Sequence, residues 1–432
     1  MFRTLATLLT VSALVVAVVL LTNLVRGGSL EPVAAAAVAQ RNANTAEPQC
    51  APHWVAAWNA SPVAASADAG PDRPEVGGRS LRMIVRPSVA GTQIRLLLSN
   101  RYGAQPLELR SVSAGLAGVG PALASPAVAV TFSGQPTGRV PAHDVLVSDP
   151  VPVSVSPASE LAVSMFVPGQ PAVVSEHPWA LRTSYLSDPG DIAGSVDGSG
   201  FDHPVSSWLV LTGVDVQTAR TTNAVLLMGD SITDGVGSSP NTDRRVSDDL
   251  AQRLATLGGA EKMAVLNAGI SGNRLLADYP SWAGEPALNR LGWEVVGRPG
   301  VTDVILHAGT NDLAAGASAR SVVDGMVQFV DEAHRAGLRV FLTTITPADT
   351  GPHGTAAAVA ARQEVNDWVR SQGRSHADGV FDFAAAVADV SRSSRLVASF
   401  DAGDGLHLSD SGYEALANAV DPTVLSGSRC LA

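Results

Sequence analysis

The hydrophobic pattern of the first half of the chain repeats every two residues. Within residues 161–167, for example, Leu161, Val163, Met165 and Val167 occupy every second position. Similar runs recur at residues 94–98 and 128–132. Clusters of Pro, Gly, Ser and Asp separate these runs, and no apolar run with a helical period interrupts them. Because a period of two is that of a half-buried strand, residues 52–216 are predicted to form a sandwich of antiparallel strands.

In the second half of the chain, strand-like and helix-like segments alternate. Short apolar runs, each consistent with a buried strand, occupy residues 225–228, 263–266, 304–307, 340–343 and 380–383. Segments with a helical period lie at residues 243–257, 285–296, 319–336, 356–372 and 411–419. The alternation predicts βαβ crossovers, and therefore an α/β domain whose parallel sheet is covered on both faces by helices.

The amino terminus carries an export signal. Arg3 precedes an apolar run over residues 5–25, which Arg26-Gly27-Gly28 closes. This run is long for a cleaved signal core, and the small residues at 33–39 that could be cleaved lie far from it. A cleaved signal peptide and an uncleaved membrane anchor both remain open, and either places the body of the protein outside the cytoplasm.

The pattern divides the chain into four parts. They are a signal peptide or membrane anchor at residues 1–28, a linker rich in Ala, Pro, Gln and Asn at 29–50, an all-β accessory domain at 51–218 and an α/β domain at 222–428. Hydrophobic residues make up 46% of the 432 residues and charged residues 16%, so the body is expected to be globular.

The charge balance argues against a nucleic-acid partner. The formal net charge is -11, and Lys262 is the only lysine. Binding to phosphates requires clustered basic side chains, and the sequence contains no such cluster. We expect a monomer.

The two cysteines, Cys50 and Cys430, lie near opposite ends of the predicted body. In the oxidising compartment that export implies, they are expected to form one disulfide that links these ends. Two unpaired surface thiols are the alternative.

A candidate nucleophile follows the first strand of the α/β domain. The apolar run 225–228 stops at Gly229, and Asp230-Ser231 comes next, which places a serine hydroxyl at the carboxyl end of a strand. Serine needs a base, and the base needs a group that orients it. Asp404 lies three residues before His407 in a glycine-containing loop, so its carboxylate can fold back onto the imidazole. Considered alone, His407 is more readily explained as a satisfied surface or core histidine.

Two further segments offer donors to an oxyanion. Asn267-Ala268-Gly269-Ile270-Ser271-Gly272-Asn273 follows the second strand, and His307-Ala308-Gly309-Thr310-Asn311-Asp312 follows the third. The backbone N–H of Gly272 and the side-chain amide of Asn311 are suitable donors for a tetrahedral intermediate. Each segment alone could instead be a tight turn with a capping Asn.

Together, these segments resemble the four sequence blocks of the SGNH (GDSL-type) hydrolase superfamily. The matching stretches are Gly-Asp-Ser-Ile-Thr-Asp-Gly at 229–235, Gly-Ile-Ser-Gly-Asn at 269–273, Gly-Thr-Asn-Asp at 309–312 and Asp-Gly-Leu-His at 404–407. The resemblance covers residues 223–420 and implies a three-layer α/β/α sandwich with a five-stranded parallel sheet, a flavodoxin-like arrangement.

The resemblance also implies roles for individual residues. Ser231 would be the nucleophile, His407 the base and Asp404 its orienting acid. The N–H groups of Ser231 and Gly272 and the side chain of Asn311 would form the oxyanion hole. No metal or organic cofactor is implied.

Two other features bear on the resemblance. The β half, with His-Trp-Val-Ala-Ala-Trp at 53–58, is more loosely similar to the amino-terminal domain of a secreted two-domain branch that is lipase-like or xylan-esterase-like. Leu408 follows His407 where the family commonly has proline. Because proline stiffens the backbone, we expect a somewhat more mobile loop here, with no loss of a catalytic role.

The leading hypothesis is therefore a secreted or surface-anchored serine carboxylic-ester hydrolase, an esterase or lipase that acts on acyl esters of carbohydrate or lipid. A non-catalytic protein that binds carbohydrate or the cell envelope is the alternative from another class. An acyltransferase that uses the same residues is a third.

Other candidate residues are weaker. Four aspartates in a Gly-rich loop could suggest calcium, although a solvated acidic loop is favoured; they are Asp188, Asp191, Asp197 and Asp202. Four tryptophans could stack on sugars, although packing is favoured for most of them; they are Trp54, Trp58, Trp179 and Trp208. Asp312 could support its loop or touch substrate, and the loop at 346–355, which contains His353, could line the substrate pocket.

Overall fold

The computed structural model describes residues 50–65, 75–169 and 174–431. The predicted signal or anchor segment at 1–28, and the predicted linker apart from its last residue, lie outside these residues. In the described ranges, no helix combines the length and the apolar character needed to cross a membrane.

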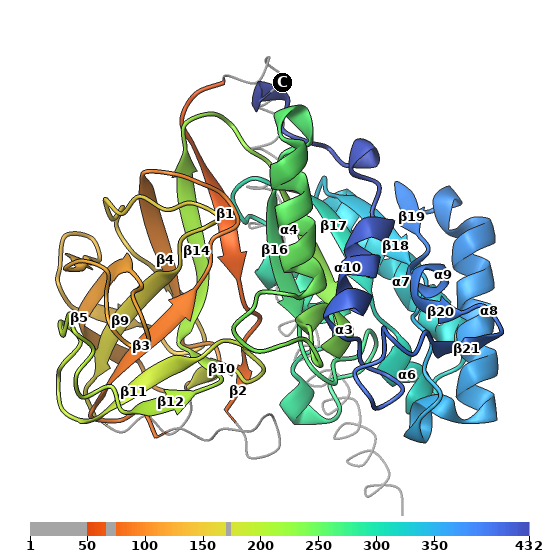
Figure 1. Cartoon of the computed structure of the whole chain (residues 1–432), viewed down its shortest axis with the longest axis horizontal. Helices are drawn as coiled ribbons and strands as arrows, with labels where there is room; N and C mark the ends of the chain where they lie inside the picture. Colours follow the sequence, from red (N-terminus) through yellow and green to blue (C-terminus); the bar gives the residue numbers. More distant parts are fainter. Residues whose placement is uncertain (1–49, 66–74, 170–173, 432) are drawn as a thin grey trace, which may run out of the picture. The chain divides into compact units, whose positions relative to one another are not determined.

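The first half of the described chain is built from antiparallel strands (Figure 1). The strands are β1 (His53–Asn59), β2 (Val63–Ala64), β3 (Arg79–Val85), β4 (Gln93–Ser99), β5 (Leu107–Leu116), β6 (Val128–Ala129), β7 (Gly138–Val140), β8 (Val145–Val147), β9 (Leu161–Val167), β10 (Ser175–His177), β11 (Ser184–Pro189), β12 (His203–Val205), β13 (Trp208–Leu209) and β14 (Leu211–Thr218). Their sheet orders are β1-β14-β4-β8, β13-β10-β2 and β12-β11-β3-β9-β5-β6, and β7 pairs with β5. The predicted antiparallel β region is confirmed.

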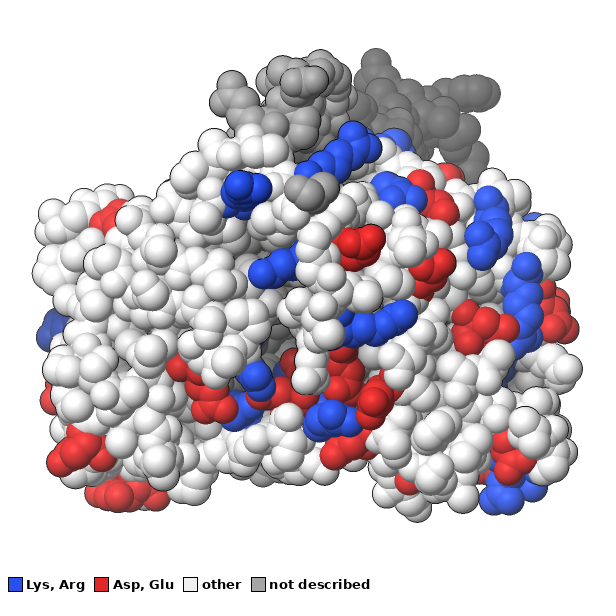
Figure 2. Space-filling view, turned by 45° about the horizontal axis from the view of Figure 1, so that its top comes forward, with Lys and Arg blue, Asp and Glu red and all other residues white. Residues whose placement is uncertain are grey.

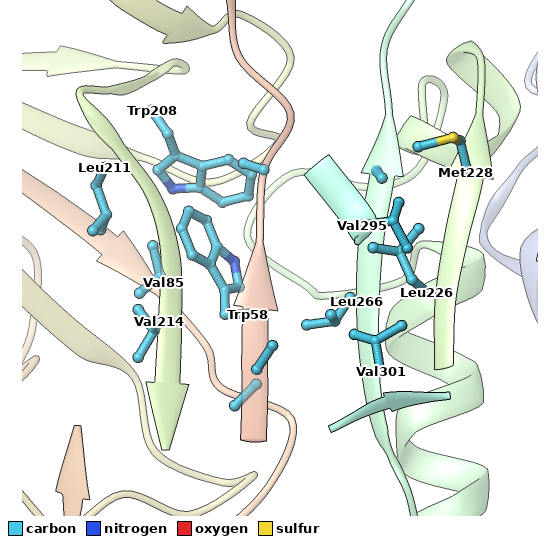
Figure 3. Close-up of a cluster of buried hydrophobic side chains, with 14 of the residues drawn as sticks. Trp58, Val85, Trp208, Leu211, Val214, Leu226, Met228, Leu266, Val295 and Val301 are labelled. Carbon is cyan, nitrogen blue, oxygen red and sulfur yellow. The ribbon is translucent and has the colours of Figure 1, made fainter. Parts of the chain in front are cut away.

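The core of this half lies between the sheets. In β9, the alternating residues Leu161, Val163, Met165 and Val167 pack into the main core, whereas Ala162 belongs to a separate small cluster. Trp58 and Trp208 are buried, and their rings meet edge to face with centroids 4.9 Å apart (Figure 3). These two tryptophans therefore pack in the core and do not form a sugar-stacking surface.

The second half contains a parallel sheet with helices on both faces. Its strands are β15 (Ala224–Gly229), β16 (Ala264–Gly269), β17 (Val301–His307), β18 (Arg339–Thr343) and β19 (Gly379–Phe381), in the order β16-β15-β17-β18-β19. The helices are α3 (Ser231–Asp234), α4 (Val246–Leu257), α5 (Ala287–Arg290), α6 (Thr310–Ala314), α7 (Ala319–Arg335), α8 (Ala356–Gln372), α9 (Phe383–Val387) and α10 (Asp410–Ala419). Shorter elements are η2 (Gly259–Glu261), η3 (Ser281–Ala283), η4 (Leu291–Val295), η5 (Gly351–Gly354), η6 (Gly373–Ser375), η7 (Pro422–Val424), η8 (Arg429–Leu431), β20 (Ala388–Asp389) and β21 (Arg392–Leu396). The predicted fold class, with five parallel strands, is confirmed.

The central strand β15 shows how the layers form. Val225 and Leu227 pack in the cluster that includes residues of α4 and α10. Leu226 and Met228 point to the opposite face, where α7 and α8 contribute to the core. Successive side chains of a strand point to opposite faces, so a continuous apolar run is what a strand covered on both sides requires.

Strand register places three strand ends side by side. Gly229 at the end of β15 is level with Gly269 of β16 and with His307 of β17. Segments that follow these residues therefore emerge at one edge of the sheet, where open α/β sheets bind their ligands.

The two halves share one continuous apolar core. Trp58 from the β half and Leu266 and Val301 from the α/β half belong to the same cluster (Figure 3). Backbone and side-chain hydrogen bonds add to it: Ala56 N donates to Pro299 O at 2.8 Å, and Asn59 Nδ2 donates to Asn267 O at 3.0 Å. The β half is thus packed against the edge of the parallel sheet.

The predicted disulfide is present. The sulfur atoms of Cys50 and Cys430 are 2.06 Å apart and connect residues separated by 380 positions. On the face shown in Figure 2, basic side chains lie among acidic ones rather than in a patch of their own.

Candidate active site

Ser231 begins the short helix α3, directly after β15. Asp230 caps this helix, and its Oδ1 accepts a hydrogen bond from Ile232 N at 3.0 Å. The turn is tight because Gly229 has no side chain: a Cβ there would lie 2.2 Å from both His307 O and Thr233 Oγ1. Ser231 is thereby held at the carboxyl edge of the sheet, with 4% of its surface exposed.

His407 lies beside this serine. Its Nε2 is 3.0 Å from Ser231 Oγ, and its Nδ1 is 2.6 Å from Asp404 Oδ2. The structure therefore brings together Ser231, His407 and Asp404, which come from two segments more than 170 positions apart. A hydroxyl, an imidazole and a carboxylate in hydrogen-bonding series can transfer a proton away from the hydroxyl.

The loop of Asp404 stabilises the carboxylate as an anion. Asp404 Oδ1 accepts hydrogen bonds from Leu406 N at 2.9 Å and His407 N at 2.8 Å. Partial burial raises the pKa of Asp404, but these two bonds and the one from the imidazole outweigh it, so the pKa lies below its usual range. Leu408, which stands where the family commonly has proline, is fully buried.

The candidate oxyanion donors lie around the same edge. Gly272 has a φ of +75°, a backbone conformation that residues with a side chain rarely adopt. A Cβ at this position would also lie 2.7 Å from the ring of Trp282, so there is no space for a side chain. In the described part of the chain, the backbone N–H groups of Ser231 and Gly272 donate to no protein acceptor. Asn311 lies in α6, and its Nδ2 donates to Asn273 O at 2.9 Å, beside Gly272.

His353 determines how the Asn311 amide is turned. The Nε2 of His353 lies 3.1 Å from Asn311 Oδ1, which can only accept a hydrogen bond. Burial lowers the pKa of His353, and the nearby His407 lowers it further, which favours the neutral ring. Because Asn311 Oδ1 can only accept, the ring donates to it from Nε2. From the sequence, His353 is predicted only to lie in a loop that could line the pocket, because no local pattern indicates a contact across 42 residues.

Two aspartates support the surrounding loops. Asp312 accepts hydrogen bonds from Leu275 N at 2.8 Å and Leu276 N at 3.0 Å, so it holds the loop that follows Gly272. Burial raises the pKa of Asp312, and it raises that of Asp230 to about 7.

A buried arginine lies beneath the strand ends. Arg290 has no exposed surface and donates to Ala268 O at 3.0 Å, Asn273 Oδ1 at 2.9 Å and Glu294 Oε2 at 2.6 Å. The pair of Arg290 and Glu294 could not be recognised from the sequence. Its only local sign is an Arg and a Glu four residues apart in a helix-like segment, a spacing that is common on exposed helices.

The acidic loop has no metal-binding arrangement. Asp188 contacts His203, Asp191 accepts from Ser111, and Asp197 accepts from Ser195 and Ser199. Among the residues that the structure describes, no group of three or more His, Cys, Asp or Glu side chains could hold a metal ion. Trp54, another weaker candidate, lies under the guanidinium of Arg95 at 4.0 Å.

A family model matches part of the α/β half. Residues 227–415 match the model of the GDSL-like lipase/acylhydrolase family. No curated protein matches the chain.

Among solved structures, the chain is similar to Est24, a carbohydrate acetylesterase from Sinorhizobium meliloti, with 20% identity and a TM-score of 0.36 over 46% of this chain and 96% of that one. It is similar to the aryl esterase of M. smegmatis, with 20% identity and a TM-score of 0.34 over 46% of this chain and 96% of that one. A GDSL-like lipase from Bacteroides thetaiotaomicron matches with 18% identity and a TM-score of 0.36 over 47% of this chain and 87% of that one.

Proposed function

We propose that the protein is a serine ester hydrolase with Ser231 as its nucleophile, since residues 227–415 match the model of the GDSL-like lipase/acylhydrolase family. His407 is the general base, and Asp404 orients its imidazole. The observation that carries the proposal is the pair of contacts at His407, 3.0 Å to Ser231 Oγ and 2.6 Å to Asp404 Oδ2.

Acylation begins when Ser231 Oγ attacks the ester carbonyl carbon and its proton passes to His407 Nε2. Asp404, whose pKa is lowered, stays ionised and balances the positive charge on the imidazolium. The tetrahedral intermediate collapses as the alcohol leaves with the proton from His407, and the acyl group remains on Ser231.

Deacylation repeats these steps with water. His407 removes a proton from the water molecule, whose oxygen attacks the acyl carbon, and the same proton returns to Ser231 Oγ as the carboxylic acid departs. The chain's own side chains supply every proton transfer in this cycle.

Three donors stabilise the intermediate oxyanion in this proposal. They are Ser231 N–H, Gly272 N–H and the second amide hydrogen of Asn311, whose first hydrogen binds Asn273 O. Removing one such donor typically lowers kcat by about 10²- to 10³-fold.

We further propose that the substrates are acyl esters of carbohydrate or lipid and that the protein acts outside the cytoplasm. The disulfide between Cys50 and Cys430 supports an oxidising compartment.

Substitution of the nucleophile tests the proposal. Ser231→Ala should abolish hydrolysis of a short-chain aryl ester and labelling by a fluorophosphonate, with an unchanged circular dichroism spectrum. Ser371→Ala, at an exposed position of α8, is the matched control and should react like the parent protein. Full activity of Ser231→Ala would refute the proposal, and a parent protein that binds polysaccharide but never reacts would favour a binding protein.

A further inference from the structure

A histidine from the β half is buried against the turn that begins with Ser231. His177, in β10, is 4% exposed, and Asp234, the last residue of α3, is 2% exposed. The Nε2 of His177 lies 2.9 Å from Asp234 Oδ1, and its Nδ1 lies 2.9 Å from Ser61 O. Because a carbonyl and a carboxylate only accept hydrogen bonds, both contacts are satisfied together by the doubly protonated imidazolium.

The surroundings of His177 favour this form. Burial lowers the pKa of His177, but the charge of Asp234 and the bonds from Asp234 and Ser61 outweigh it, so the pKa is raised. Arg245, which precedes α4, opposes this effect. On the side of Ser61 lie Arg290 and Glu294, which pair with each other, and β13 contributes the uncharged ring of Trp208, 5.5 Å away.

The other oxygen of Asp234 holds the segment that carries an oxyanion donor. Asp234 Oδ2 accepts a hydrogen bond from Ser271 N at 2.9 Å, and the next residue is Gly272. Helix α3 and the segment that follows β16 can touch because Gly269 has no side chain. A Cβ at Gly269 would lie 2.1 Å from Asp234 N. One carboxylate thus connects His177 to the backbone next to Gly272 N–H.

An apolar contact supports the same segment. Val63 of β2, which pairs with β10, clusters with Ile270 and Trp282. Trp282 in turn lies against Gly272. The β half therefore supports residues 270–272 in two ways. The polar contact runs from His177 through Asp234 to Ser271, and the apolar contact joins Val63 to Ile270 and Trp282.

Building on the function proposed above, we propose that His177 is a positioning residue of the oxyanion hole, supplied by the β half and acting through Asp234 on Ser271 and Gly272. In its charged form, His177 fixes one oxygen of Asp234. The other oxygen then holds Ser271 N in place, and this keeps the N–H of the next residue, Gly272, turned toward the oxyanion. Small displacements of a donor lower the rate because stabilisation of the transition state depends on geometry.

This role has a pH signature. A histidine whose pKa is raised in the folded protein stabilises the arrangement below its unfolded pKa and loses that effect as pH rises through the folded pKa. The kcat of the parent protein should therefore fall on the alkaline side as His177 loses its proton. Glutamine can place an amide donor opposite Asp234 that does not titrate in this range.

The test compares His177→Ala, His177→Gln and His203→Ala in the full chain, with an aryl ester as substrate. His203 forms a 2.9 Å pair with Asp188 at a half-exposed position, so it is a matched surface control. We expect His177→Ala to lower kcat by about 10- to 100-fold with KM changed less than about threefold. His177→Gln should recover most of kcat and lose the alkaline fall, and His203→Ala should match the parent protein.

Two outcomes would overturn this inference. One is that His177→Ala keeps the parent kcat and pH profile while Ser231→Ala is inactive. The other is that His177→Gln is as slow as His177→Ala, or keeps the alkaline fall. If His177→Ala does not fold, the pH profile of His177→Gln alone decides. Failure of the proposed function is distinct, because Ser231→Ala would then remain active.

Discussion

His353 Nε2 donates to Asn311 Oδ1 across 3.1 Å, and this contact determines which end of the Asn311 amide points away from His353. With the oxygen engaged by His353, the nitrogen is directed toward Asn273 O and the proposed oxyanion. The orientation of the amide proposed to bind the oxyanion is therefore fixed by a residue from a loop that follows β18.

Removal of this contact should lower activity through Asn311. We predict that His353→Ala lowers kcat by about tenfold, because the freed amide samples other orientations. Asn311→Ala should lower kcat by about 10²-fold or more, and the double variant should be no slower than Asn311→Ala alone, since both changes remove the same donor. Steady-state kinetics on an aryl ester measures this, with the exposed His376→Ala as the control. Additive losses in the double variant would contradict a shared role.

The pair of Arg290 and Glu294 should matter for stability. Arg290→Ala leaves the buried carboxylate of Glu294 without its charged partner, and we predict a loss of about 3–5 kcal/mol in the free energy of unfolding. Replacement of both residues by Met and Leu should recover much of that loss, since no uncompensated charge remains.

Urea unfolding measures this difference. The matched control is the pair of Arg320 and Asp324, which has the same spacing but 87% and 63% side-chain exposure. Arg320→Ala should cost less than about 1 kcal/mol because water screens exposed pairs. Equal losses at the two sites would argue against a special cost of burial.

Asp230 should make the stability depend on pH. Burial raises its pKa to about 7, so the folded state holds a proton that the unfolded state releases at lower pH. The unfolded state therefore binds fewer protons between its own pKa and about 7, and the free energy of unfolding should decrease as pH rises through this window.

Asn at this position can still cap α3 and does not titrate. Asp230→Asn should therefore flatten the pH dependence of the unfolding free energy between pH values of about 4 and 7. Thermal unfolding at several pH values provides the comparison with the parent protein. An unchanged slope would mean that Asp230 does not titrate in this window.

Much of the fold could be predicted because its signals are local. The continuous apolar run of β15 and the alternation in β9 each reflect the burial of a single strand. The site residues Ser231, Gly272 and Asn311 follow strand ends, and parallel strands bring their ends to one edge of a sheet.

Helix boundaries depended on contacts that the sequence does not display. The helix predicted over 243–257 begins only at Val246, because Asp243 adopts a φ of +53° and pairs with Arg86 and Arg182. The helix predicted over 285–296 is α5 followed by the π-helical turn η4, in which Glu294 faces Arg290.

The supporting contacts around the site were equally hidden. His177 and Asp234 lie in different halves of the chain, and His353 and Asn311 follow different strands. None of these pairs produces a periodic or spaced pattern, so only the folded arrangement reveals them.

The bond between Cys50 and Cys430 closes the described chain into a covalent ring of 380 residue steps. A protease that cuts once between β14 and β15, at residues 219–223, would separate the two halves in sequence but not in space. The nicked molecule would run as a single species on a non-reducing gel and as two fragments after reduction.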